Sequence, residues 1–121
     1  MIVRGSCHCK ATVFELSYEP ATVTRCTCSI CSKRGALWAY YSPADVKFKK
    51  DVAPTGYEWR TKTVKHNFCS VCGCTTYTRT PDWSKGVPDF DNPKISINTR
   101  LLDDFDLDAV DVVVIDGKNL W

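Results

Sequence analysis

Hydrophobic and polar residues alternate with a period of two over much of the chain, and no long stretch follows the 3.6-residue period of a helix. The alternating stretches are rich in β-branched and aromatic residues, and turn-forming residues such as Pro43 and Gly56 lie between them. The pattern predicts a mainly all-β protein of small antiparallel sheets with little helix. We expect strands at residues 11–18, 36–41, 45–49, 57–64, 75–80 and 94–99.

Helix is expected in two short places only, at the turn that opens at Ser29 and around residues 101–105. Residues 81–93 hold three prolines and a glycine, so we expect a loop there. A loop of that length in a compact domain is often functional. The β-branched run near the end, followed by Asp116 and Gly117, predicts a last strand, a tight turn and a packed Trp121.

The length of 121 residues suits one domain with a modest core, so residues 1–121 are expected to form a single unit. No apolar run reaches membrane-spanning length, and residues 1–10 lack the apolar segment of a secretion signal. We therefore expect a cytoplasmic protein without a membrane partner. Charge is uneven, with fifteen Lys and Arg against eight Asp and Glu in residues 1–100, and one Lys against six Asp in residues 101–121. That imbalance is too small to indicate nucleic-acid binding by itself.

Eight cysteines are the unusual feature of the composition. They indicate either a disulfide-rich secreted protein or thiolate ligands for metal in a reducing compartment. Cysteines two or three positions apart rarely bridge each other, whereas they readily converge on one ion. Because the chain also lacks an export signal, metal binding is favoured. The cysteines form three groups: CHC (Cys7, Cys9), CTCSIC (Cys26, Cys28, Cys31) and CSVCGC (Cys69, Cys72, Cys74).

Cys69 and Cys72, followed by Gly73, have the spacing of a zinc knuckle, in which both thiolates face one ion. Cys7 and Cys9 are the natural second pair, because residues i and i+2 of an extended segment point to the same side. The result is a closed four-cysteine site. In so small a domain its binding energy is folding energy, about 10 kcal/mol or more. A metal-free thiol core and an iron centre are the alternatives.

Cys26, Cys28 and Cys31 remain, and the spacing again brings their three sulfurs together. Catalytic zinc is usually held by three protein ligands, with a fourth position open to water or substrate. The triplet is therefore predicted to hold a second, catalytic zinc. The alternative is a second structural zinc whose fourth ligand comes from elsewhere in the fold, with these candidates: Cys74, His8 and His66.

Zinc deprotonates a coordinating thiol, and a thiolate is a nucleophile toward an electrophile such as an aldehyde. A small thiol-bearing peptide carries carboxylates that basic residues beside the triplet can hold; the candidates are Arg25, Lys33 and Arg34. His66 is expected to be a satisfied strand histidine rather than a general base, and spacing identifies no proton acceptor. Aromatic residues are expected in the core or in a pocket wall: Trp38, Tyr40, Trp59, Tyr77 and Trp83.

Four segments, GSCHCKATVF, RCTCSICSKRG, FCSVCGCTTY and VVIDGKNLW, resemble the glutathione-dependent formaldehyde-activating enzyme family, which includes centromere protein V. The resemblance covers nearly the whole chain and implies a β-tent fold with zinc knuckles. It implies a structural zinc on Cys7, Cys9, Cys69 and Cys72, and a catalytic zinc on Cys26, Cys28 and Cys31. Its implied activity is addition of the glutathione thiol to formaldehyde, giving S-hydroxymethylglutathione, with a carbon–sulfur lyase step in reverse. Two departures are Lys10, where the family usually has glycine, and the additional Cys74.

Two other functions fit the same residues. One is a zinc-stabilised binding module for protein or nucleic acid without catalysis, which for nucleic acid requires a contiguous basic face. The other is a redox sensor or metal buffer that uses an exposed triplet. The catalytic hypothesis leads, with a small thiol such as glutathione as substrate.

Overall fold

The computed structural model describes residues 2–58 and 64–120. These residues form mainly strands, with two short α-helices and two single 3₁₀ turns, as the hydrophobic pattern predicted. The strands are β1 (Val3–Ser6), β2 (Thr12–Leu16), β3 (Thr22–Cys26), β4 (Trp38–Tyr41), β5 (Val46–Asp51), β6 (Pro54–Tyr57), β7 (Lys65–Cys69), β8 (Thr75–Asp82), β9 (Asp89–Asn98) and β10 (Asp111–Ile115). The helices are α1 (Ser29–Arg34) and α2 (Gly117–Leu120), and the 3₁₀ turns are η1 (Pro43–Asp45) and η2 (Thr99–Leu101).

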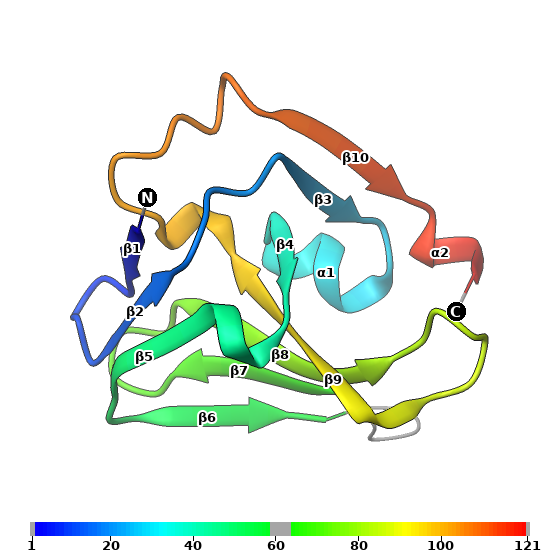
Figure 1. Ribbon diagram of the computed structural model, residues 1–121, viewed down its shortest axis with the longest axis horizontal. Coiled ribbons are helices and arrows are strands. Elements are labelled where there is room, and N and C mark those ends of the chain that lie inside the picture. Colours follow the sequence, from blue (N-terminus) through cyan, green and yellow to red (C-terminus); the bar gives the residue numbers. More distant parts are fainter. Residues whose placement is uncertain (1, 59–63, 121) are drawn as a thin grey trace.

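The strands form two sheets. A three-stranded sheet has the order β1-β2-β5, and a seven-stranded sheet has the order β10-β3-β4-β9-β8-β7-β6. Figure 1 shows the smaller sheet on the left, near the N-terminus. Helix α1 lies beside β3 and β4, above the strands at the other end of the larger sheet. All pairings are antiparallel except that of β10 with β3, which is parallel and was not predicted.

The hydrophobic core lies between the small sheet and one face of the large sheet. Strand alternation explains which side chains enter it: Ala39 and Tyr41 on β4 pair with Ile97 and Ile95 on β9, and all four are buried. Phe14 from the small sheet packs edge-to-face against Phe48. Among the described residues, the buried members of this core cluster are Val3, Phe14, Leu16, Ala39, Tyr41, Tyr77, Ile95, Ile97 and Leu102.

The opposite face of the large sheet is polar. Its β4 residues are Trp38 and Tyr40, which pair with Asn98 and Ser96 of β9. Residues directly opposite each other in a sheet project from the same face, so these side chains lie together on the side away from the core. The two faces of one sheet therefore serve different purposes, one for packing and the other for polar contacts.

Most predicted strands are present with shifted ends. The expected strands at 11–18, 36–41, 45–49, 75–80 and 94–99 correspond to β2, β4, β5, β8 and β9. Most of the one expected at 57–64 lies outside the described residues, and β6 ends at Tyr57. Strands β1, β3, β6 and β7 were not predicted, because segments of only four or five residues are too short for a clear alternation pattern.

The expected loop at 81–93 was wrong in extent. β8 continues to Asp82 and β9 begins at Asp89, so only residues 83–88 connect the two strands. Pro93 is tolerated inside β9 because β4 pairs with this strand only from Ile95 onward, and the proline therefore removes no hydrogen bond from that ladder. Trp83, expected in the core or a pocket wall, is 44% exposed in this connection.

The end of the chain also differs from the prediction. The last strand is present as β10, but it is followed by α2 rather than a tight turn, and Trp121 lies outside the described residues. The helix expected at 101–105 is reduced to η2, which ends at Leu101. The turn predicted at Ser29 is confirmed as the first turn of α1. No helix in residues 2–58 or 64–120 is long and apolar enough to span a bilayer.

Candidate metal centre and active-site face

Four sulfur atoms meet where the β1–β2 turn approaches the β7–β8 turn, and we call Cys7, Cys9, Cys69 and Cys72 the first cluster. All four Sγ atoms lie within 4.8 Å of one another. The Cys7–Cys9 and Cys9–Cys69 sulfur distances are 3.7 and 3.6 Å. A tetrahedral ion with sulfur ligands at about 2.3 Å requires sulfurs about 3.8 Å apart. The donor set therefore fits a tetrahedral thiolate-bound ion.

The Cys7–Cys9 pair forms in a different way from that predicted. The segment is a tight turn rather than an extended strand, closed by a 3.1 Å hydrogen bond from the Lys10 N–H to the Cys7 carbonyl. Lys10 adopts a φ of 65°, the left-handed region that favours glycine. The Thr12 N–H then donates to Cys7 Sγ at 3.3 Å, which stabilises a thiolate there.

The second pair is held by a knuckle, as predicted. The Gly73 N–H donates to the Cys69 carbonyl at 2.8 Å, and Gly73 has a φ of 81° that other residues adopt only with strain. Backbone N–H groups of Cys74 and Cys9 lower the pKa of Cys72 to about 5. Cys72 is thus a thiolate at neutral pH, ready to bind a cation.

The second cluster consists of Cys26, Cys28 and Cys31, whose three Sγ atoms also lie within 4.8 Å of one another. Cys26 ends β3, Cys28 occupies the N-cap position of α1 and Cys31 lies in its first turn, so the end of a strand and the start of a helix bring the three sulfurs together. Within the part of the chain that the structure describes, no fourth cysteine, histidine or carboxylate joins this group. None of the eight cysteines forms a disulfide, which agrees with metal binding rather than a disulfide scaffold.

Hydrogen bonds from distant segments hold the second cluster in place. Between Cys26 and Cys28, the Thr27 N–H donates to the Ile115 carbonyl at 3.1 Å, and its hydroxyl accepts from the Lys118 N–H at 3.2 Å. The parallel β10 strand therefore supports the loop that carries the ligands. At the other end of α1, Arg100 Nε donates to the Gly35 carbonyl at 2.8 Å.

Burial shifts the pKa values of two thiols in the second cluster. Burial raises the pKa of the Cys26 and Cys31 thiols, although a hydrogen bond from the Trp38 side chain opposes this effect at Cys31. Both thiols are therefore protonated at neutral pH in the absence of a cation, and binding a metal must release their protons.

Of the three predicted basic residues, Arg34 lies against the sheet. Its guanidinium carbon is 5.6 Å from the centre of the Phe68 ring, and its Nη1 atom is buried without a hydrogen-bond partner among the described residues. Arg25 is exposed, and strand alternation directs it away from the face that carries Cys26. Lys33 is exposed in the last turn of α1, where a cation complements the helix dipole.

A polar row crosses the sheet beside α1. Pairing aligns Tyr40, Ser96, Thr78 and His66 on four neighbouring strands, and the last three are buried. Burial, and secondarily the Arg34 guanidinium, lower the pKa of His66, so its ring is neutral near pH 7. Alternation within β4 shows that Trp38 and Tyr40 share a face, but only the pairing of strands shows that this face also carries the second cluster.

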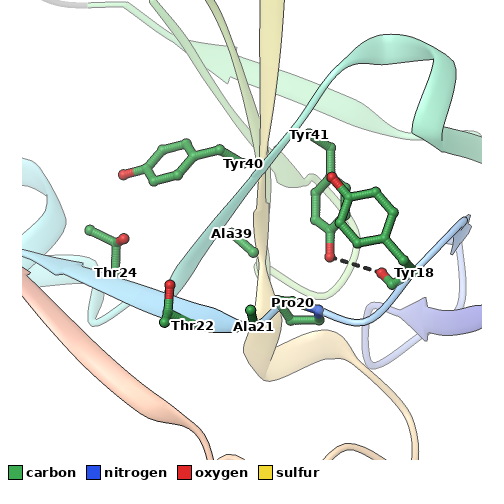
Figure 2. A pocket seen from close by; sticks show the side chains of 8 residues that line it. All are labelled: Tyr18, Pro20, Ala21, Thr22, Thr24, Ala39, Tyr40 and Tyr41. Carbon is green, nitrogen blue, oxygen red and sulfur yellow. Dashed lines mark hydrogen bonds between the residues drawn. The ribbon is translucent and has the colours of Figure 1, made fainter.

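A cavity of about 180 Å³ opens between β3 and β4, which pair only at Thr24 and Trp38 and then separate. Figure 2 shows Thr24 and Tyr40 at one end of this cavity and Tyr18 and Tyr41 at the other. The Tyr41 hydroxyl donates to the Tyr18 carbonyl at 3.1 Å, which closes that far end. The end with Thr24 is the one nearer to Cys26, two residues further along β3.

Comparison with known proteins identifies the family. The sequence model of the family described as glutathione-dependent formaldehyde-activating enzyme matches residues 2–107. The chain belongs to this family. The resemblance drawn from the cysteine motifs is thereby confirmed.

Two relatives illustrate the similarity. A Halomonas elongata protein, provisionally named a glutathione-dependent formaldehyde-activating enzyme, is 30% identical over 100 residues, which cover 74% of this chain and 64% of that protein. The chain thus spans less than two thirds of that relative. The crystal structure of a Rhodobacter sphaeroides protein matches with a TM-score of 0.70 and 28% identity, over 91% of this chain and 99% of that one.

Proposed function

We propose that this protein is a zinc-dependent enzyme of carbon–sulfur lyase type, which forms or cleaves the adduct between a glutathione-type thiol and a small aldehyde such as formaldehyde. The observation that carries this proposal is the second cluster: three sulfurs within 4.8 Å of one another, with no fourth ligand among the described residues. Membership of the formaldehyde-activating family supports the choice of thiol and aldehyde.

Two zinc ions have different roles in this proposal. The first cluster supplies four sulfurs and joins turns that are 60 residues apart, so its ion is structural. The second cluster supplies three sulfurs. When bound there, zinc lowers the pKa of a thiol that joins it, so that the thiol reacts as a thiolate at neutral pH.

Arg34 supplies the recognition of the substrate's charge. A buried guanidinium nitrogen without a partner costs about 1–3 kcal/mol or more, and a carboxylate that binds it recovers this cost. Arg34 lies one helical turn after Cys31, so both project from the same face of α1. A peptide carboxylate on Arg34 would thus place the peptide's thiol toward the second cluster.

The test is to supply glutathione and formaldehyde and to measure exchange between free and adduct formaldehyde by NMR. We expect the wild-type protein with full metal content to accelerate exchange above the spontaneous rate. Cys28→Ala should abolish the acceleration, whereas Cys74→Ala, which removes a cysteine of neither cluster, should keep it. A wild-type rate equal to the background would reject the enzymatic function.

Metal stoichiometry is the companion measurement. Two zinc ions per chain are expected for the wild type, and one for Cys28→Ala. One ion in the wild type would instead favour the zinc-stabilised binding module.

A further inference from the structure

The chemistry of thiol addition leaves one requirement that the cysteines do not meet. As the carbon–sulfur bond forms, the carbonyl π electron pair moves to oxygen, which becomes negatively charged until it receives the proton that the thiol gave up. A hydrogen-bond donor aimed at this oxygen stabilises the transition state, and removing one such donor typically costs about 10²–10³ in rate. The donor must lie beside the second cluster and be accessible to substrate.

Tyr40 meets these conditions. The pairing of Thr24 with Trp38 places Thr24 and Cys26 of β3 on the same face as Trp38 and Tyr40 of β4. Figure 2 shows the Tyr40 side chain directed toward the end of the cavity where Thr24 lies, and Thr24 is two residues before Cys26 on β3, so the hydroxyl points toward the part of β3 that leads into the second cluster. At 48% exposure the ring remains open to solvent and substrate.

The cavity between β3 and β4 gives the aldehyde a place to bind. Tyr40 and Thr24 border the end nearer to Cys26, and Figure 2 shows both side chains there, well apart from the Tyr18–Tyr41 pair. A volume of about 180 Å³ exceeds what formaldehyde needs. The cavity therefore has room for the substituent of a larger aldehyde beyond the reacting carbon.

We propose that the Tyr40 hydroxyl donates a hydrogen bond to the oxygen of the thiol–aldehyde adduct, and that the β3–β4 cavity binds the aldehyde part. This inference rests on the proposed function. A tyrosine hydroxyl is protonated at neutral pH, so it can donate this hydrogen bond. The thiol's proton reaches the adduct oxygen through water, so the tyrosine ends each turnover unchanged.

The first experiment compares Tyr40→Phe with Tyr57→Phe, which removes the hydroxyl of an exposed tyrosine on β6, away from the cavity. We expect Tyr40→Phe to lower kcat for exchange by about tenfold to a hundredfold, with little change in KM for glutathione and an unchanged zinc content. Tyr57→Phe should remain within about twofold of the wild type. A Tyr40→Phe variant with wild-type kcat would overturn the inference while the enzymatic function stands.

The second experiment does not depend on catalysis. Glutathione and excess formaldehyde form their adduct spontaneously, and this mixture is titrated into protein labelled with ¹³C at the tyrosine Cζ atoms. The Tyr40 signal, identified by its loss in Tyr40→Phe, should shift with the adduct and much less with glutathione alone. Binding of the adduct without a Tyr40 shift would reject the role of Tyr40 only. An adduct that neither binds nor exchanges faster than background would reject both this inference and the proposed function.

Discussion

The two cysteine clusters are built from similar short motifs but hold the molecule together in different ways. The first cluster joins the β1–β2 turn to the β7–β8 turn, so its sulfurs come from segments 60 residues apart. The second cluster takes all of its sulfurs from six consecutive residues at the junction of β3 and α1. A cross-link between distant segments removes more conformational entropy from the unfolded chain than a local one, by about 2 kcal/mol for a loop ten times longer.

The groups that surround the two cysteine clusters differ as well. Backbone groups of tight turns support the sulfurs of the first cluster, and the Lys10 and Gly73 conformations show how tightly those turns are wound. The second cluster instead depends on the C-terminal strand and faces a polar surface with a cavity nearby. In the proposed function, the four sulfurs from distant segments therefore maintain the fold, and the three local sulfurs leave a position for chemistry.

The largest expected effect is the loss of folding when the first cluster is broken. Cys69→Ser removes a buried sulfur ligand and with it most of a metal-binding free energy of about 10 kcal/mol, which is comparable to the whole stability of a small domain. We expect no cooperative thermal transition by circular dichroism. Cys31→Ser, the matched variant in the second cluster, should still unfold cooperatively. Equal loss of structure in both variants would contradict the division of roles.

A chelator should remove the two ions one after the other. With a millimolar chelator we expect the ion of the second cluster to leave first, because three protein ligands hold it and its fourth position is open. Exchange activity should then be lost while far-ultraviolet circular dichroism is unchanged. Unfolding should follow only when the second equivalent of zinc is released, as measured with a colorimetric zinc indicator. Simultaneous release of both ions would count against the comparison.

Acid should also distinguish the clusters. Because burial raises the pKa of Cys26 and Cys31, each must give up a proton to bind metal, and each released proton weakens apparent affinity about tenfold per unit of falling pH. We therefore expect the second cluster to lose affinity by roughly a hundredfold per pH unit below neutrality.

In the first cluster, the pKa values of two thiols are shifted in opposite directions. The Ala11 N–H lowers the pKa of Cys9, but burial and the neighbouring thiols outweigh this effect and raise it to about 12. Backbone N–H groups lower the pKa of Cys72 to about 5. Four sulfurs with one already ionised should retain metal to lower pH than three. Zinc content after dialysis between pH 8 and pH 5.5 measures this order, and earlier loss from the first cluster would reverse it.

The smallest expected effect concerns the support of the second cluster by the C-terminal segment. Thr27→Val keeps the shape of the side chain but removes a hydroxyl that accepts from the Lys118 N–H and donates to the Ile115 carbonyl, and the loss costs about 1 kcal/mol or more. We expect zinc affinity of the second cluster to fall by about fivefold, measured by competition with a chelating dye. Thr55→Val, on exposed β6, serves as the control and should change nothing. An unchanged affinity in Thr27→Val would show that β10 does not support the site.

Local patterns predicted the local structure well. The alternation at residues 11–18 and 36–41 gave strands because side chains in a strand point alternately to two faces. The spacing of Cys69 and Cys72 gave a knuckle because a two-residue gap with a following glycine closes a turn by itself. The Cys7–Cys9 pair was grouped correctly for the wrong reason, since a tight turn and not an extended segment brings its sulfurs together.

The sequence alone determined which sulfurs belong together, because ligands a few residues apart are placed by short-range geometry, and it determined the mainly β character. Only the tertiary structure decided what lies around those sulfurs: that β10 pairs in parallel with β3, that Arg34 turns inward and Arg25 away, and that Tyr40 shares a face with Cys26. These relations depend on which strands pair and in which register. A shift of one residue in pairing reverses the face of every side chain, and no local pattern in the sequence fixes that choice.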